Sequence, residues 1–258
     1  MKVCLAQTEI RFEEKEENRR VAEKLIRNAS ARGMDMILFP EMSFTGFSMN
    51  TELIGEEYRE TPEFISGLAR ERSINIGFGW VKKDDKGYQN CYSIVGRNGK
   101  EAADYVKIHP FSYSGEDIYY KAGDHLCIFE VEKHQIAVFI CYDLRFPELF
   151  RAVSDKVSAV IIPANWPAKR SEHWKTLLRA RAIENQLYIL AINCCGDMNG
   201  QYYSGDSCVI NPNGDVLKML SDSAGVIDFD LSDDTVQYRE AFPVLKDRRP
   251  KLYSGLFT

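Results

Sequence analysis

Short runs of apolar residues recur along the chain at the length of β-strands and predict a sheet-rich protein. The clearest runs are KVCLAQT, DMILFP, INIGFGWV, YSIVG, LCIFEV, IAVFIC, VSAVIIP, LYILAINC and SCVI. Several are apolar at consecutive positions, as expected for strands that are buried on both faces. Turn signals at residues 84–87, 97–100 and 211–214 predict hairpins between other strands. Because crossovers and hairpins both occur, we expect mixed sheets.

Helical spacing of apolar residues separates these strands and predicts helices that cover the sheets. Residues 14–32 show this spacing, with glutamates at the start and Gly33 at the end. Residues 171–186 show it again, and Ser171 is a candidate N-cap. A third helix is expected to begin near Pro147, because proline is favoured at the first helical position.

Length and composition agree with one globular α/β domain. The 258 residues are 45% hydrophobic and 28% charged, which is ordinary for a protein with a sizeable core. No repeat, low-complexity tract or linker rich in Pro, Gly and Ser divides the chain. We therefore expect a single domain over residues 1–258, in which residues from about 231 form a C-terminal arm.

The charge pattern and the cysteines argue against several classes of protein. A net charge of −5, from 33 basic and 38 acidic residues, does not suit nucleic-acid binding. No apolar stretch reaches the ~18 residues of a membrane span, and the N-terminus lacks the apolar core of a signal peptide. The 7 cysteines include no C-x-x-C pair, which argues against a disulfide framework or a structural zinc site. We expect a cytoplasmic protein with reduced thiols and no membrane or nucleic-acid partner.

One cysteine, Cys141, lies where an apolar run ends and the polar segment YDLRFPE begins. A buried structural cysteine is the commonest fate of this residue. In open α/β sheets, however, active groups gather where strands end. A thiol near the N-terminus of the following helix would have its thiolate favoured. Position alone leaves both a structural and a catalytic role open.

A cysteine nucleophile needs a base, and the chain offers more than one. Of the 4 histidines, only His109 lies near a comparable junction, so a Cys–His pair has weak support. Glu41 follows the run DMILFP, and desolvation beside aromatic residues would raise its pKa toward the range useful for proton transfer. Lys107 ends another β-like segment. A lone acid or lysine is usually solvated, but carboxylate, ammonium and thiol together supply the parts for acyl transfer.

The segments FPEMSFTGF, YVKIHPF and ICYDLRFPELFR resemble, in order and spacing, the signature segments of the nitrilase superfamily of carbon–nitrogen hydrolases. VCLAQTEI, ANWPAKRSEHWKTLLRARAIENQLYILAIN and YYSGDSCVINPNGDVL extend the resemblance over about residues 2–230. The ANWPAKRSEHW block is most similar to the ω-amidase branch, which hydrolyses the side-chain amide of small ω-amido acids such as α-ketoglutaramate. Ala137, Phe139 and Pro110 depart from the common pattern and bear on the shape of the pocket wall.

The resemblance implies a fold and a catalytic set. The fold would be α/β, a four-layer α-β-β-α sandwich of two mixed sheets. Cys141 would be the nucleophile, Glu41 the general base and Lys107 the third member of a triad. Glu116 would be a second acid beside them, although its SGED context also suits a plain loop acid.

The resemblance also suggests substrate-binding residues around the triad. The backbone N–H of Tyr142 would help Lys107 to hold an oxyanion, and Phe111 would help to close a small apolar pocket. Asn165 and Trp166 follow another strand, and Trp166 fits either a pocket wall or the core.

A substrate carboxylate would need a cationic anchor. Arg145 or Arg170 could make a forked contact with it. For Arg145, pairing with Glu148 to brace the turn is the stronger interpretation of the sequence alone.

The implied enzyme uses no cofactor and no metal, takes a small-molecule amide as substrate and assembles as a homodimer or larger homo-oligomer. One alternative is another branch of the superfamily, an N-carbamoyl amidohydrolase or a nitrilase. A second is a non-catalytic scaffold, which predicts a damaged triad. A third is a redox thiol protein, which predicts cysteines paired for cycling.

Overall fold

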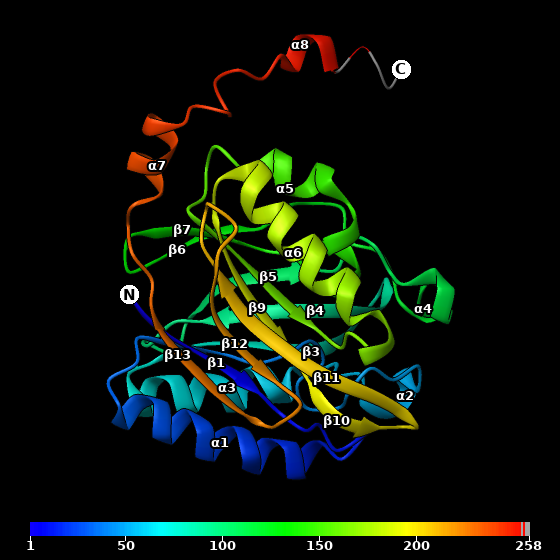
Figure 1. The fold of residues 1–258 in the computed structure, drawn as a ribbon. Helices are drawn as coiled ribbons and strands as arrows, with labels where there is room; N and C mark the ends of the chain where they lie inside the picture. The colour runs from blue at the N-terminus through cyan, green and yellow to red at the C-terminus, as the bar shows by residue number, and fades with distance from the viewer. Residues whose placement is uncertain (254, 256–258) are drawn as a thin grey trace.

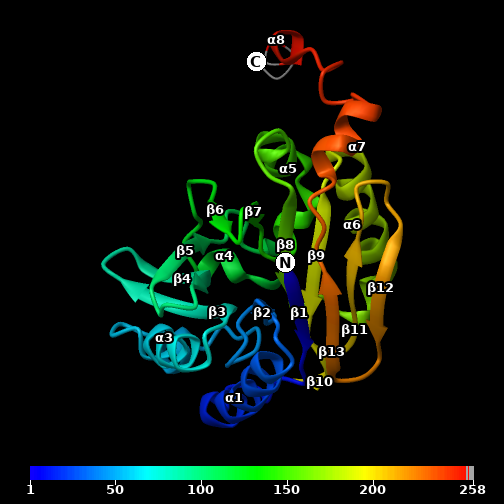
Figure 2. The ribbon, with the colours of Figure 1, turned by 90° about the vertical axis from the view of Figure 1, so that its left-hand side faces the viewer.

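The computed structural model describes residues 1–253 and 255 and shows two β-sheets packed face to face between layers of helices (Figures 1 and 2). The first sheet has six strands in the order β13-β1-β2-β3-β4-β5. Their bounds are β1 Lys2–Gln7, β2 Met36–Leu38, β3 Asn75–Asp84, β4 Gly87–Val95, β5 Glu101–Val106 and β13 Gly225–Asp230. Strands β1, β2 and β3 are parallel, whereas β4, β5 and β13 pair antiparallel with their neighbours.

The second sheet has seven strands in the order β10-β11-β9-β8-β7-β6, with β12 paired to β11. Their bounds are β6 Ile128–Val131, β7 His134–Val138, β8 Ala159–Ala164, β9 Tyr188–Asn193, β10 Cys195–Met198, β11 Gln201–Ile210 and β12 Val216–Ser221. Strands β7, β8 and β9 are parallel, and the remaining pairs are antiparallel. Hairpins join β3 to β4, β4 to β5 and β11 to β12 at the three predicted turns.

The inner faces of both sheets meet in one hydrophobic core. Leu5, Leu38 and Tyr92 from the first sheet and Ile161 and Leu190 from the second are fully buried in it. Strands β8 and β9 are buried at every position, which explains why their sequences are apolar without alternation.

Helices cover the outer face of each sheet. α1 (Lys15–Ala31) and α3 (Glu60–Arg72) pack on the first sheet, and α5 (Pro147–Val153) and α6 (Ser171–Asn185) on the second. In Figure 1, α1 and α3 lie at the bottom, with α5 and α6 above them. The arrangement confirms the predicted α-β-β-α sandwich. The expected capping role of Ser171 is wrong, because Ser171 is already helical and its hydroxyl donates to Asp206 at 2.7 Å.

Short helices occupy the edges and the C-terminal part. They are α2 Thr51–Ile54, α4 Glu116–Tyr119, α7 Thr235–Ala241 and α8 Pro250–Tyr253. Residues after β13 run outward from the sandwich, and α7 and α8 lie at the top of Figure 1. In the part of the chain that the structure describes, no helix is both long enough and apolar enough to cross a bilayer.

A close approach between β3 and the segment after β2 fixes Glu41. Gly79 accepts from the Ser43 N–H at 3.0 Å and donates its own N–H to the Ser43 hydroxyl at 2.9 Å. A Cβ at Gly79 would lie 2.8 Å from the carbonyl carbon of Glu41 and closer still to the Met42 nitrogen. Only glycine leaves room for this backbone contact.

We expect Gly79→Ala to lower the free energy of unfolding by roughly 1–3 kcal/mol, because the backbone must move to admit the methyl group. Gly67→Ala in α3 is the matched control, since nothing lies within 4 Å of its added Cβ. It should raise stability by ~0.5–1 kcal/mol through helix propensity. Urea unfolding of both variants checks this, and an unchanged midpoint for Gly79→Ala would contradict the close approach.

Candidate functional site

One pocket, with a volume of ≈ 210 Å³, opens where strands of both sheets end. Among the residues predicted for the site, it is lined by Glu41, Lys107, Phe111, Cys141, Tyr142, Arg145, Asn165 and Trp166. Glu41 follows β2, Lys107 follows β5 and Cys141 follows β7, so the strand ends bring together groups that are far apart in sequence. Glu116 does not line the pocket, but its carboxylate accepts a hydrogen bond from the Lys107 ammonium. The roles of these residues remain predictions.

Cys141 sits on a strained turn. The chain continues the β7 pairing through Phe139, whose N–H donates to Ile161, and then turns sharply. Cys141 has a φ of 46°, in the left-handed region that non-glycine residues rarely adopt. Such strain is typical of functional sites. A 3₁₀ turn over Cys141–Arg145 follows, so the N–H of Tyr142 lies at the start of a helical turn.

The Lys107 ammonium lies between two carboxylates. Its Nζ donates to Glu41 Oε1 at 2.8 Å and to Glu116 Oε2 at 2.8 Å and Oε1 at 3.1 Å. All three side chains are at most 1% exposed. Burial alone would lower the pKa of Lys107, but the charges of Glu116 and Glu41 raise it above its ordinary value. Lys107 is therefore a permanent cation at neutral pH.

Both oxygens of the Glu41 carboxylate have donors. Oε1 also accepts from Asn90 Nδ2 at 2.8 Å, and Oε2 accepts from the Asn165 N–H at 2.9 Å. Burial alone would raise the pKa of Glu41, but Lys107, Asn90 and Asn165 together lower it below its ordinary value. The expectation of a raised pKa is therefore wrong, because it considered the burial of Glu41 but not the opposing effect of Lys107, Asn90 and Asn165. Glu41 is ionised and able to accept a proton.

The Cys141 thiol is held in its protonated form. Burial and then the charge of Glu41 raise its pKa well above 9.0, and Lys107 and the Asn165 N–H only partly oppose them. The expected preference for the thiolate is therefore wrong, because burial and then the charge of Glu41 raise the pKa more than the nearby donors lower it. No hydrogen bond joins the thiol to Glu41 among residues 1–253 and 255. Contacts between base and nucleophile are often long before substrate binds.

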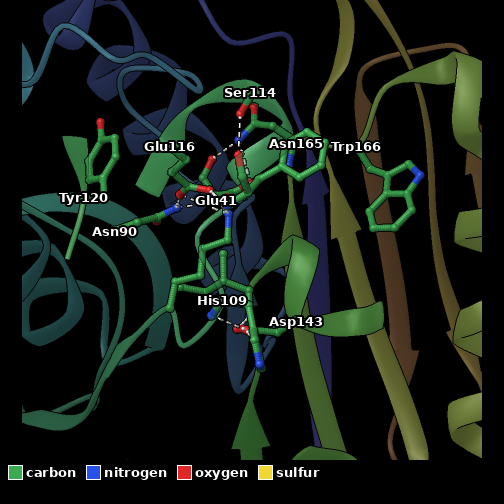
Figure 3. Close-up of polar contacts among 12 residues, drawn as sticks. Glu41, Asn90, His109, Ser114, Glu116, Tyr120, Asp143, Asn165 and Trp166 are labelled. Atoms are coloured by element: carbon green, nitrogen blue, oxygen red, sulfur yellow. Dashed lines mark hydrogen bonds and ion pairs between the residues drawn. The ribbon is translucent and has the colours of Figure 1, made fainter. Parts of the chain in front are cut away.

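Asn90, on β4, joins the two carboxylates and was missed in the sequence. Its Nδ2 donates to Glu41 Oε1 at 2.8 Å and to Glu116 Oε1 at 2.9 Å (Figure 3). Its backbone carbonyl accepts from the Lys107 N–H at 2.9 Å. Burial raises the pKa of Glu116, with Lys107 lowering it and Glu41 raising it further. Glu116 and Asn90 thus fix the positions of Lys107 and Glu41 relative to each other.

Asn165 clamps the Glu41 segment from the opposite sheet. Its Nδ2 donates to the backbone carbonyl of Glu41 at 2.7 Å, in addition to the backbone contact with the carboxylate. Asn165 therefore holds Glu41 in place as well as lining the pocket. Trp166 combines its two expected roles: it is 3% exposed, belongs to the core and also lines the pocket.

Arg145 and Arg170 give the pocket a positive wall. The expected pairing of Arg145 with Glu148 is not formed: its guanidinium lies 4.8 Å from the centroid of the Trp166 ring and 3.3 Å from His173 Nδ1. The Arg170 guanidinium lies 5.4 Å from the centroid of the Phe111 ring. Neither arginine forms an ion pair with a carboxylate in the described part of the chain. Burial and the charge of Arg170 lower the pKa of Arg145.

His109 does not line the pocket. Its Nδ1 pairs with Asp143 Oδ1 at 2.8 Å, and its ring stacks on Phe146 at 3.6 Å. Figure 3 shows this pair apart from the group formed by Glu41, Asn90 and Glu116. Asp143 also accepts from the Tyr105 hydroxyl at 2.8 Å and from the Ile140 N–H at 3.0 Å. The pair therefore braces the turn that carries Cys141.

Further lining residues had no signal in the sequence. They are Tyr113, Ser114, Pro167, Lys169, Gln201 and Tyr203. Arg170, a candidate anchor from the sequence, and Phe47 complete the lining. Most come from irregular segments and from the tip of the β10–β11 hairpin, whose placement periodicity does not reveal. Over residues 1–253 and 255, no group of three or more His, Cys, Asp or Glu side chains could hold a metal ion.

The protonation state of Cys141 can be measured directly. Because its pKa is raised, the thiolate should be absent at pH 7–8 and form only above the ordinary value of 9.0. The ultraviolet difference absorbance between native protein and Cys141→Ser, followed against pH, reports this thiolate. Thiolate absorbance that is already complete at pH 6 would contradict the assignment. Cys127→Ser, which alters a cysteine outside the pocket, controls for the loss of a thiol elsewhere.

Comparisons with known proteins agree over nearly the whole chain. Residues 2–240 match the sequence profile described as carbon-nitrogen hydrolase. The 2-oxoglutaramate amidase of Bacillus subtilis (strain 168) is 34% identical over 257 residues, 97% of this chain and 98% of that protein. The omega-amidase YafV of Escherichia coli (strain K12) is 37% identical over 218 residues, 83% of this chain and 84% of that protein.

Solved structures show the same fold. XC1258 from Xanthomonas campestris, a CN-hydrolase superfamily protein with an arsenic adduct in its active site, has a TM-score of 0.92 and 28% identity. The match covers 96% of this chain and 97% of that chain. A mutant of the Nesterenkonia AN1 amidase, from the nitrilase superfamily, has a TM-score of 0.88 at 23% identity, covering 99% of this chain and 97% of that chain.

Proposed function

Because the chain belongs to the carbon–nitrogen hydrolase family, we propose that it releases ammonia from the ω-amide of a small carboxylic acid, such as α-ketoglutaramate, through a thioester on Cys141. Membership confirms the family predicted from the signature segments and makes the chain a hydrolase acting on amides. The observation that carries the narrower proposal is the shared pocket of Cys141, Glu41 and Lys107 with two arginines that have no acidic partner among the described residues.

In the first half of the reaction, Glu41 accepts the thiol proton while Sγ of Cys141 attacks the amide carbon. The oxyanion that forms is stabilised by the Lys107 ammonium and by the N–H of Tyr142; one such donor is typically worth ~3 kcal/mol. Protonated Glu41 then gives its proton to the amide nitrogen, the C–N bond breaks, and ammonia leaves. The acyl group remains on sulfur as a thioester.

In the second half, Glu41 accepts a proton from a water molecule that attacks the thioester carbon. The same donors stabilise the second oxyanion. The C–S bond breaks, sulfur takes back a proton from Glu41, and the carboxylic acid leaves. Ammonia and acid are thus produced from amide and water, and the triad returns to its starting state. Glu116 and Asn90 touch no reacting atom in this scheme and act by positioning.

The arginines favour a substrate that carries a carboxylate. Arg145 and Arg170 line the same pocket. Burial and the charge of Arg170 lower the pKa of Arg145. Two unneutralised guanidiniums in a small pocket attract an anion and bind it by forked hydrogen bonds. Lys169, which also lines the pocket, adds a further positive charge. A dicarboxylic acid monoamide fits, with its amide at Cys141 and its carboxylate at the arginines.

We further propose that the protein is a homodimer, as the resemblance suggests, and that it is located in the cytoplasm, as expected from the sequence. Apolar side chains on α6 and β12 support self-association: Ile183 is 49% exposed, Val216 42% and Met219 40%. A second copy could cover them by packing its own α6 against this face.

Cys141→Ala should abolish turnover. We expect native protein to release ammonia from α-ketoglutaramate or succinamate and the variant to lose at least about a thousandfold of this rate, because the covalent step is removed. Acid quenching followed by mass spectrometry should find an acyl adduct on Cys141 of native protein. Cys127→Ala, outside the pocket, should retain activity. Full activity of Cys141→Ala, or an adduct on another cysteine, would refute the mechanism.

Arg170→Met and Arg145→Met should weaken binding of the anionic substrate. We expect each to raise KM for succinamate by about ten- to hundredfold, the value of a hydrogen bond to a charged group. Hydrolysis of butyramide, which lacks the carboxylate, should change little. Arg20→Met, on the exposed face of α1, is the control. Equal losses on succinamate and butyramide would show that the arginines support the fold rather than bind the carboxylate.

A further inference from the structure

Tyr203, the third residue of β11, has a hydroxyl without a hydrogen-bond partner among residues 1–253 and 255. Its side chain is 5% exposed and lines the pocket. Every other buried tyrosine of the described residues is hydrogen-bonded: Tyr92 to Phe39, Tyr105 to Asp143, Tyr120 to Ser48, and Tyr188 to Ser232 and Asp234. A buried phenol normally finds a partner. The exception faces the pocket that holds the candidate triad.

Tyr203 lines the same pocket as Cys141 and Arg170. Burial raises the pKa of its hydroxyl, and Cys194, Cys141 and Glu41 raise it further. Arg170 acts in the opposite sense. The hydroxyl therefore stays protonated at neutral pH. It is available as a hydrogen-bond donor to a substrate that spans from Cys141 to Arg170.

Between its amide and its carboxylate, the proposed substrate can carry different groups on the carbon next to the carboxylate. With its amide carbon at Cys141 and its carboxylate at the arginines, the carbon next to the carboxylate lies part-way along the wall. A 2-oxo group there presents an acceptor, whereas a methylene presents none. An ammonium group there would be a poor fit, because Arg145 and Arg170 already place unneutralised positive charge in this wall.

We propose that the Tyr203 hydroxyl donates a hydrogen bond to the 2-oxo oxygen of the substrate, so that the site selects 2-oxo acid ω-monoamides over the matching acids with a methylene or an ammonium at that carbon. The inference rests on the proposed function. It assigns Tyr203 a binding role that a pocket-wall residue chosen only for shape would not have. A site with a donor poised for one oxygen discriminates against substrates that lack it.

The test compares Tyr203→Phe on two substrates of equal length, 2-oxoglutaramate and glutaric acid monoamide. We expect kcat/KM for 2-oxoglutaramate to fall about five- to tenfold, the effect of one neutral hydrogen bond, mainly through KM. The value for glutaric acid monoamide should stay within about twofold. Taking the ratio of variant to native for each substrate cancels differences in substrate behaviour in solution. Thermal unfolding of the variant checks that the fold is intact.

Tyr202→Phe is the matched control. Tyr202 precedes Tyr203 on β11, but its side chain lies outside the pocket and its hydroxyl donates to Asp222 at 2.9 Å. It should leave both substrates unaffected. An equal loss on both substrates with Tyr203→Phe, or no loss on either, overturns the role of the hydroxyl while leaving the amidase intact. Failure of native protein to hydrolyse either monoamide overturns the proposed function, and the inference with it.

Discussion

The ion pairs of Lys107 are the interaction on which the rest of the site depends. A buried ammonium is expensive to desolvate, and it is retained only where opposite charge and further hydrogen bonds compensate. Here two carboxylates do so, one from the segment after β2 and one from the first turn of α4. Asn90 from β4 and Asn165 from the second sheet then satisfy oxygens of the same carboxylates. One cation thus ties together strand ends from both sheets.

This network also sets the charge of each group before substrate arrives. Glu41 is ionised because Lys107 stabilises its negative charge, and Cys141 is neutral because burial and the charge of Glu41 oppose a second negative charge there. Moving the proton from sulfur to Glu41 is therefore uphill in the resting site. In the proposed reaction, this proton transfer becomes favourable as negative charge leaves sulfur for the oxyanion, where Lys107 can stabilise it. The thiolate is then formed only in the presence of an acceptor carbon, which limits side reactions of a reactive sulfur.

The sequence predicted the frame and the grouping of Glu41, Lys107 and Cys141, but not the electrostatics of that group. Apolar runs located β8 and β9, and turn signals located the hairpins, because burial patterns and turn chemistry are local features of the sequence. Glu41, Lys107 and Cys141 were found through strand ends and signature segments. The directions of the pKa shifts of Glu41 and Cys141 were wrong, because the sequence does not give the balance between burial and the effects of partners distant in the chain; 66 positions separate Lys107 from Glu41. Asn90 was missed for the same reason, since a lone asparagine in a strand carries no local signal.

The residues proposed for chemistry and the residues proposed for substrate recognition lie in different parts of the fold. Of the groups proposed for chemistry, Glu41 and Lys107 are buried and Cys141 is partly buried, and all of them lie within three residues of the end of a strand, where the sheets hold the backbone. The groups proposed for recognition, Arg170 and Tyr203 with Lys169 at the rim, come from the 3₁₀ turn after β8 and from the start of β11. Substitutions in these outer segments would alter the shape and charge of the wall without disturbing Lys107. Such a division allows one reaction to be kept while the acid that carries the amide changes. It also explains why the grouping of Glu41, Lys107 and Cys141 could be predicted from short segments, whereas the proposed preference for a 2-oxo group depends on the unpaired Tyr203 hydroxyl, which only the folded chain brings to the pocket.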